Sequence, residues 1–210
     1  MTVLKYLCPL VIAYLAGAIP FGLLIGFYNG VDIRKFGSGN IGATNVTRCC
    51  GPLLGKVCFG CDFLKGFLPT WITLLFFPDC PLVVLGAAAC TVLGHMFPCY
   101  LKFKGGKGVS TAGGAMLAVA PVAVLTAGIL WVIFFLWTRY VSVASIIAAL
   151  AIIAVVWAGR LGDLCYFSAT AKSLPTVIFC TVLGLLAIAR HKENIVRLIH
   201  GTENRFERKK

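Results

Sequence analysis

A glycine-rich polar segment between the first two apolar stretches has the composition of an anion-binding loop. It runs from Gly37 to Arg48 with the sequence GSGNIGATNVTR. Its glycines tolerate positive φ and allow several backbone N–H groups to converge on one anion. Ser38 and Asn45 add short neutral donors, and Arg48 adds a planar guanidinium group that suits phosphate. The pattern favours phosphate binding, with a flexible interhelical loop as the alternative.

A second polar segment, KFKGGKGVST at residues 102–111, interleaves three lysines with glycines directly before a predicted helix. Backbone N–H groups and the helix dipole favour phosphate at such a position. The segment is not a Walker A loop, because Leu101 occupies the first glycine position and Gly108 follows Lys107 where Ser or Thr is needed. We expect an anion site without a nucleotide; lysines that merely anchor the chain are the alternative, but those need no glycines.

The third candidate segment is the basic stretch from Arg190 to Gly201. In a helix, the spacing of His191, Asn194 and Arg197 places these three side chains near one another. The same helix has an apolar stripe, so an amphipathic helix on the membrane surface is the alternative.

Polar residues inside the apolar runs are interpreted as structural. Asp62 and Lys65 lie three positions apart, so we expect them to pair, since isolated charges in a membrane segment are costly. His95 is expected to be a satisfied interhelical histidine, with a position lining the site as the alternative. Cys58 and Cys61 have C-x-x-C spacing, but no second pair or nearby histidine completes a metal set, so no metal is predicted.

The overall composition predicts an integral membrane protein. Of the 210 residues, 60% are hydrophobic and only 12% are charged, whereas a soluble domain carries about a quarter charged residues. The mean hydropathy is +0.94. The net charge of +12 is concentrated in the segments between apolar runs and in the tail, as the positive-inside rule predicts, and nucleic-acid binding is not expected.

Charge and apolar length together predict the topology. The first joint, residues 28–51, is more basic than the N-terminal flank, so the N-terminus is expected outside. Six apolar runs would leave the basic tail outside as well. The run at 109–137 is long and contains Pro121, and splitting it there gives seven crossings and a cytoplasmic tail. Five crossings, with one run re-entrant or lying flat on the membrane, is the alternative. The apolar runs lie at 4–27, 53–77, 82–101, 109–137, 141–157 and 174–190.

These expectations describe one domain, residues 1–210, built as an all-α polytopic bundle of about seven transmembrane helices. The first run is expected to be retained rather than cleaved as a signal peptide, because it is long for one. All three polar segments then lie on the cytoplasmic face. We expect a substrate that carries phosphate and a hydrophobic part able to remain in lipid.

The motifs identify a resemblance to the bacterial acyl-phosphate:glycerol-3-phosphate acyltransferase family (PlsY). It rests on SGNIGATNVTR at 38–48, KFKGGKGVST at 102–111 and HKENI at 191–195, in that order. Further matches are DFLKG at 62–66, GHMFP at 94–98 and RYVS at 139–142. The resemblance covers essentially the whole chain.

The resemblance implies an enzyme that transfers a fatty acyl group from acyl phosphate to the sn-1 hydroxyl of glycerol 3-phosphate. The products are lysophosphatidic acid and phosphate, in phospholipid biosynthesis. It implies no cofactor and no metal, function as a monomer, and a multi-pass position in the bacterial cytoplasmic (inner) membrane. The active site would face the cytoplasm, and the partners would be the two substrates and membrane lipid.

The resemblance also assigns residues. In the first segment, Ser38, Gly39 and Arg48 would bind phosphate. His191 and Asn194 would complete the site, Glu193 would hold the architecture, and Ser145 would reach the glycerol phosphate. The residues of the second segment with a phosphate-binding role would be Lys104, Gly105, Gly106, Lys107 and Gly108.

Acyl phosphate is an activated mixed anhydride, so its leaving phosphate needs charge stabilisation, which fixed cations and N–H donors supply. The attacking hydroxyl must lose a proton. His191 is one candidate acceptor, with an unperturbed pKa of about 6.5. A phosphate oxygen of the donor is the other, and the resemblance favours this substrate-assisted route.

Two other functions remain as alternatives. A transporter of phosphorylated metabolites would carry charged or broken-helix sites near the bilayer midplane and related halves. A phosphatidyl-alcohol transferase would need an acid-rich metal cluster, whereas only seven Asp and Glu residues are scattered along this chain.

Overall fold

The computed structural model describes residues 2–162 and 169–206 of the chain, and every regular element in these two ranges is a helix. This confirms the all-α prediction. The elements are α1 (Thr2–Ala18), α2 (Phe21–Tyr28), η1 (Ile33–Lys35), α3 (Ala43–Cys50), α4 (Pro52–Phe76), α5 (Pro81–Met96), η2 (Cys99–Leu101), α6 (Val109–Val119), α7 (Pro121–Thr138), α8 (Val141–Leu161), α9 (Ala169–Lys172), α10 (Leu174–Ala189) and α11 (Lys192–Ile199).

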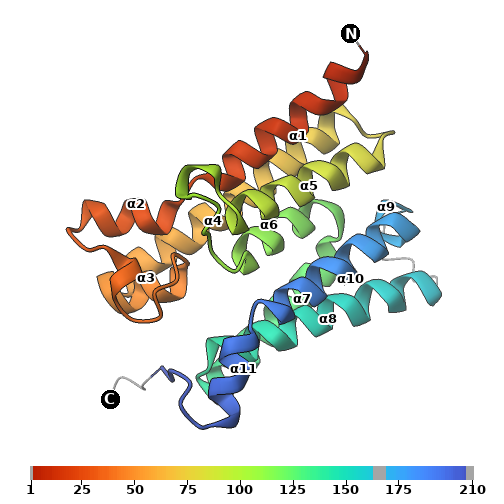
Figure 1. Cartoon of the computed structure of the whole chain (residues 1–210). Coiled ribbons are helices and arrows are strands. Elements are labelled where there is room, and N and C mark those ends of the chain that lie inside the picture. The colour runs from red at the N-terminus through yellow and green to blue at the C-terminus, as the bar shows by residue number, and fades with distance from the viewer. Residues whose placement is uncertain (1, 163–168, 207–210) are drawn as a thin grey trace. The chain divides into compact units, whose positions relative to one another are not determined.

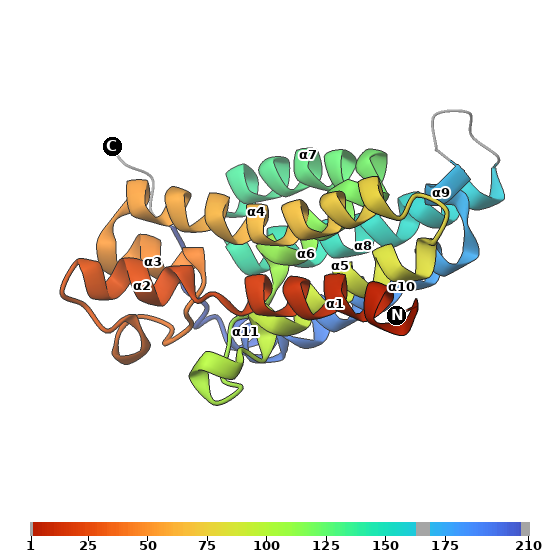
Figure 2. The same ribbon diagram turned by 90° about the horizontal axis from the view of Figure 1, so that it is seen from above.

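The helices form two compact units, residues 1–118 and 119–210, and each unit is described by itself. The single-domain expectation stays a prediction. In the first unit α1, α4 and α5 pack alongside one another (Figure 1, Figure 2).

Small residues bring the helices of the first unit into close contact. A Cβ on Gly17 of α1 would lie 2.1 Å from the Thr91 carbonyl oxygen of α5. A Cβ on Gly66 of α4 would lie 2.1 Å from the Thr111 carbonyl oxygen of α6. Glycine therefore permits backbone-to-backbone approach at both helix pairs, as is common in membrane bundles.

The predicted break at Pro121 is confirmed. Helix α6 ends at Val119 and α7 begins at Pro121, with Ala120 between them in a non-helical conformation. Proline is tolerated at this first helical position because its missing N–H would have no partner within the helix. The first apolar run is also interrupted, between Ala18 and Phe21 at Pro20, which was not predicted.

Several elements are long and apolar enough to cross a membrane. Within the described ranges, four meet both criteria, and α10 with α11 makes a fifth if this pair, bent by 49°, is one span. Helix α6 is apolar but shorter, and α4 is 25 residues long but carries Lys56, Asp62 and Lys65. The protein is thus a multi-pass helical membrane protein, while seven crossings and the orientation stay predictions. The four elements are Leu4–Tyr28, Pro81–Leu101, Pro121–Thr138 and Val141–Leu161.

In the second unit α7 and α8 pack together through a tight turn, and α10 packs on α8 (Figure 1). Arg139 ends α7 in the left-handed region at φ 64°. Ser173 caps α10 by accepting a hydrogen bond from the Thr176 amide. Large apolar side chains on α7, including Ile129 and Trp137, are exposed, as expected for a helix that faces lipid.

Candidate active site

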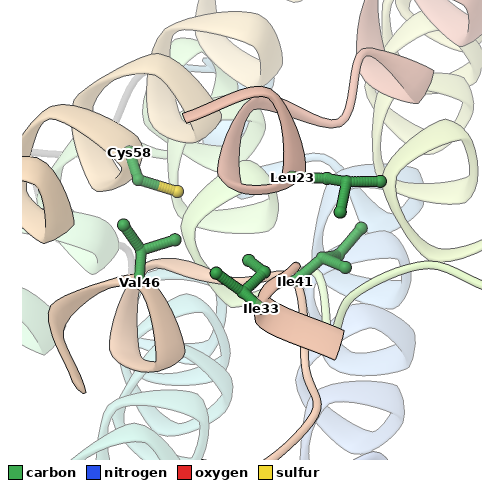
Figure 3. Close-up of a cluster of buried hydrophobic side chains, with 5 residues drawn as sticks. All are labelled: Leu23, Ile33, Ile41, Val46 and Cys58. Atoms are coloured by element: carbon green, nitrogen blue, oxygen red, sulfur yellow. The ribbon is translucent and has the colours of Figure 1, made fainter. Parts of the chain in front are cut away.

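A buried apolar cluster lies beneath the first joint. Figure 3 shows its five side chains, which come from α2, η1, the loop before α3, α3 itself and α4. Leu101, directly before the glycine-lysine segment, packs against the same cluster. The first joint and the second candidate segment therefore occupy the same end of the first unit, as predicted. The cluster consists of Leu23, Ile33, Ile41, Val46 and Cys58.

Asn45 organises the first joint from inside. Its side chain is 1% exposed, and Nδ2 donates to the carbonyl oxygens of Ile33 at 2.7 Å and Phe36 at 3.1 Å. Its Oδ1 accepts from the Ser38 amide at 2.9 Å. The amide thus binds the backbone of its own loop. Asn45 was predicted to contact phosphate; its side-chain hydrogen bonds in the structure go to the backbone of its own loop, and the phosphate contact stays a prediction.

The turn that Asn45 holds contains two glycines with positive φ, Gly37 at 60° and Gly39 at 68°. A Cβ on Gly37 would lie 2.3 Å from Asn45 Oδ1, so the close approach of loop and amide requires glycine. Ser38 and Gly39 are exposed at the tip of this turn. Arg48 lies half-buried on α3, one turn after Asn45.

The glycine-lysine segment folds back onto the end of α5. The amides of Gly105 and Gly106 donate to the carbonyl oxygens of Met96 and His95, both at 3.1 Å. These two N–H groups therefore satisfy carbonyl groups left over at a helix C-terminus. The structural contribution of the two glycines is close approach: a Cβ on Gly106 would lie 2.1 Å from His95 Nε2.

The lysines of this segment differ in exposure. Lys104 is exposed, Lys107 is half-buried, and Gly108 is buried with a φ of 82° just before α6. Fixed cations next to a helix start are suited to hold an anion. The Gly105 and Gly106 amides already bond to α5, so the predicted anion binding by this segment, which stays a prediction, would fall mainly to the lysine side chains.

The predicted Asp62–Lys65 ion pair is present and buried, with Nζ 2.7 Å from Asp62 Oδ1. Lys65 also donates to the Ile19 carbonyl oxygen at 2.7 Å, at the break between α1 and α2. His95 Nδ1 lies 3.6 Å from Asp62 Oδ1, and the ring is 5% exposed. This cluster joins the break in the first run to the base of the glycine-lysine segment. The expected pairing of Asp62 and Lys65 is confirmed, but His95 Nδ1 is buried without a hydrogen-bond partner among the described residues, so the histidine is not fully satisfied as expected. Cys58, beside Asp62, is a free thiol.

The remaining predicted residues lie in the second unit. His191 is 4% exposed, and its Nδ1 lies 2.7 Å from the Ala187 carbonyl oxygen. A carbonyl oxygen only accepts, so Nδ1 carries the proton and Nε2 is the basic nitrogen of the neutral ring. Ser145 is 5% exposed and accepts a hydrogen bond from Trp131 Nε1 at 3.2 Å.

Asn194 and Arg197 meet at Glu203, a residue that the sequence reasoning missed. Asn194 Nδ2 donates to Glu203 Oε1 at 2.6 Å, and Arg197 Nε donates to Oε2 at 2.8 Å. Ser142 donates to Oε1 from the start of α8 at 3.0 Å. Glu193, expected to hold the architecture, is instead 88% exposed and 4.0 Å from Arg197. One signal was available: Glu203 is an acid within a strongly basic tail.

In the part of the chain that the structure describes, two carboxyl groups outside the apolar helices have shifted pKa values. Burial acts to raise the pKa of Glu203, but hydrogen bonds from Asn194, Arg197 and Ser142 outweigh it and hold the pKa below its ordinary value of 4.5. In the first joint, hydrogen bonds from the Arg34 side chain hold the pKa of Asp32 below its usual range.

Known proteins are similar to this chain along nearly its whole length. The model of the family described as glycerol-3-phosphate acyltransferase matches residues 7–201. The chain belongs to the glycerol-3-phosphate acyltransferase family. A glycerol-3-phosphate acyltransferase of Aquifex aeolicus is 42% identical over 203 residues, covering 97% of this chain and 100% of the relative. Glycerol-3-phosphate acyltransferase 2 of Thermotoga maritima is 41% identical over 196 residues, covering 93% of each.

Two solved structures of this acyltransferase family also match. Both are crystal structures of PlsY, an integral membrane glycerol 3-phosphate acyltransferase. The glycerol 3-phosphate form superposes with a TM-score of 0.87 at 42% identity, covering 97% of this chain and 96% of that one. The lysophosphatidic acid form gives a TM-score of 0.85 at 41% identity. The predicted family resemblance is confirmed, and the roles of the individual site residues stay predictions.

Proposed function

We propose that the protein transfers a fatty acyl group from acyl phosphate to the sn-1 hydroxyl of glycerol 3-phosphate, releasing lysophosphatidic acid and inorganic phosphate. The observation that carries the proposal is the first unit's polar end. Two glycine-rich cationic segments share one apolar cluster there, in a chain that matches glycerol-3-phosphate acyltransferases along nearly its whole length.

The reaction needs cations more than it needs an acid catalyst. The glycerol hydroxyl oxygen bonds to the acyl carbon, the bond from that carbon to the phosphate oxygen breaks, and phosphate leaves with its electron pair. Arg48, Lys104 and Lys107 would stabilise the charge on the two phosphate groups, and Ser38 and Gly39 would add donors at the exposed turn. Holding both anions in place also lowers the entropic barrier.

The proton of the attacking hydroxyl has two possible destinations, a phosphate oxygen of the donor or His191 Nε2. We favour the phosphate, with His191, like Asn194 and Ser145, as a binding or orienting group. Under this mechanism His191→Ala lowers kcat but leaves the pH–rate profile with the same limbs. A limb near pH 6–7 that disappears in the variant would identify His191 as the base instead.

The decisive test of function is an assay with purified protein, palmitoyl phosphate and radiolabelled glycerol 3-phosphate, without metal or coenzyme A. We expect a lipid-extractable lysophosphatidic acid and one phosphate released per product. Palmitoyl coenzyme A in place of palmitoyl phosphate should give no product. Label that accumulates unchanged inside sealed proteoliposomes would instead support transport.

The same proposal includes a position in the bacterial inner membrane as a one-domain monomer of seven crossings, with the N-terminus outside and the site in the cytoplasm. Single cysteines at Phe36, Phe103 and Lys192, in a variant without the ten native cysteines, test it. A membrane-impermeant maleimide should label all three only after the cells are permeabilised. Labelling of any one of them in intact cells would contradict this topology.

A further inference from the structure

Glu203 lies two residues past the range that the family model matches, yet it is the centre of a partly buried polar cluster. Its side chain is 5% exposed, and three side-chain donors converge on its two oxygens. A carboxylate only accepts hydrogen bonds, and a buried one is costly unless its charge is compensated. Arg197 supplies the compensating charge, and Ser142 and Asn194 supply the remaining donors.

The backbone after α11 is arranged to deliver this carboxylate. The Thr202 amide donates to the Arg197 carbonyl oxygen at 2.8 Å, which turns the chain back at the end of α11. The Phe206 amide donates to the Arg139 carbonyl oxygen at 3.0 Å, and the Phe206 ring meets the Phe135 ring edge-on at 5.8 Å. Residues 202–206 are thus fixed at both ends, against α11 and against the turn between α7 and α8.

Glu203 determines how the Asn194 amide is oriented. Since the carboxylate accepts, the nitrogen of the amide must face Glu203, and Oδ1 must point the other way. The bond of 2.6 Å is short, as charge-assisted hydrogen bonds are. Without Glu203 the Asn194 Nδ2 group would lose this acceptor, and the orientation of the amide would be less strongly fixed. Catalytic groups lose much of their effect when they are displaced by as little as 1 Å.

We propose that Glu203 is a positioning residue of the acyltransferase site, which fixes the orientation of Asn194 and ties α11 to the start of α8. The inference rests on the proposed function, in which Asn194 takes part in the reaction. Glu203 itself touches neither substrate, and it acts through Asn194.

The test compares Glu203→Gln with Glu193→Gln in the full-length protein. Both substitutions remove one negative charge next to Arg197, but only Glu203 is buried and bonded to Asn194. We expect kcat/KM for glycerol 3-phosphate to fall between about tenfold and a hundredfold in Glu203→Gln, and to stay within about twofold in Glu193→Gln. Glu203→Asp, which keeps the charge, should recover part of the loss. Equal effects of the two Gln variants would overturn the proposal.

A double-mutant cycle separates positioning from general stabilisation. In an Asn194→Ala background, Glu203→Gln should change kcat/KM by less than about twofold, because the residue that it positions is absent. A full multiplicative effect in this background would overturn the proposal. Activity of the unsubstituted protein tests the proposed reaction itself. Failure of the proposed function can therefore be told apart from failure of the proposal for Glu203.

A measurement without substrate covers the case in which a variant is inactive for another reason. Hydrogen exchange at the Thr202 and Phe206 amides reports directly on residues 202–206. We expect faster exchange at both in Glu203→Gln and Glu203→Asp than in Glu193→Gln. Unchanged protection in both Glu203 variants would overturn the proposal.

Discussion

The first joint and the C-terminal segment are each held in place by a single side chain, but the two side chains differ in their chemistry. Each contains polar residues predicted to bind substrate, and each is held by one buried side chain with three hydrogen bonds. Asn45 is a neutral amide whose partners are backbone groups of its own loop. Glu203 is a charged acceptor whose partners are side chains, one of them 61 residues away.

The difference follows from what each group can offer. An amide both donates and accepts, so Asn45 can satisfy two carbonyl groups and one N–H group of a tight loop. A carboxylate accepts only, so Glu203 gathers donors from separate helices and carries a charge that depends on pH. We therefore expect the contribution of Asn45 to be insensitive to pH and that of Glu203 to weaken in acid.

The largest effect is expected from Asn45→Ala. It would leave the buried Ile33 carbonyl group without a partner and would remove the partly buried hydrogen bonds to the Phe36 carbonyl group and the Ser38 amide. The buried orphan costs about 1–3 kcal/mol and each of the other lost bonds about 0.5–1.5 kcal/mol, so we expect a total loss of roughly 2–5 kcal/mol in unfolding free energy. Thermal unfolding in detergent measures it, with the activity assay alongside.

Asn45→Asp sharpens this prediction, because it keeps the shape but replaces the donor with an acceptor facing two carbonyl oxygens. We expect it to be at least as harmful as Asn45→Ala. A stable Asn45→Asp protein with normal activity would show that the amide does not organise the joint.

The second-largest effect is expected from Gly37→Ala, and Gly30→Ala is its matched control because both glycines have positive φ. Gly37, at 60°, has Asn45 Oδ1 2.3 Å from the position of a Cβ, whereas Gly30, at 72°, has nothing within 4 Å. Both alanine variants bear the strain of about 1 kcal/mol of a left-handed residue, so the difference between them isolates the contact with Asn45. We expect Gly37→Ala to lower the unfolding midpoint clearly more than Gly30→Ala, and equal midpoints would contradict the role of Asn45.

The contrast between Asn45 and Glu203 also explains which features of the fold and the site could be predicted from the sequence. Asn45 lies inside a recognisable motif, so it could be selected, but its partners are backbone groups that only the folded turn defines. Pro121 was interpreted correctly because proline restricts its neighbours locally. Glu203 could not be placed, because its role depends on Ser142 from another helix and on the path of residues 202–206. Likewise, the amides of Gly105 and Gly106 were expected to serve an anion, and only the fold shows them on the end of α5.

A smaller effect is expected from acid on the C-terminal segment. The folded-state pKa of Glu203 lies below 4.5, so the folded protein binds this proton less tightly than the unfolded chain. Its stabilisation is complete above pH 4.5 and is lost as the pH falls through the folded-state value. The difference in unfolding midpoint between the unsubstituted protein and Glu203→Gln should therefore shrink below pH 4.5. A difference that stays constant down to pH 3 would contradict the assignment.

The smallest effect is expected from Asp32→Asn. Asp32 accepts hydrogen bonds from Arg34 Nε and Nη2, both at 2.9 Å, and the arginine side chain is 49% exposed. Exposed ion pairs contribute little because water and salt screen them. We expect thermal unfolding and activity close to those of the unsubstituted protein. A large loss of activity would show that the first joint also depends on charge, which would remove the contrast with Glu203.

The central claim is that the polar end of the first unit binds the phosphate groups. Titration calorimetry with glycerol 3-phosphate measures this most directly, using the unsubstituted protein, Arg48→Ala, Lys107→Ala and the control Lys5→Ala from the opposite end of α1. We predict that the Arg48 and Lys107 variants bind at least about tenfold more weakly, since each loses a charge-assisted hydrogen bond. The Lys5 variant should bind normally. Unchanged affinity in both Arg48→Ala and Lys107→Ala would contradict the account.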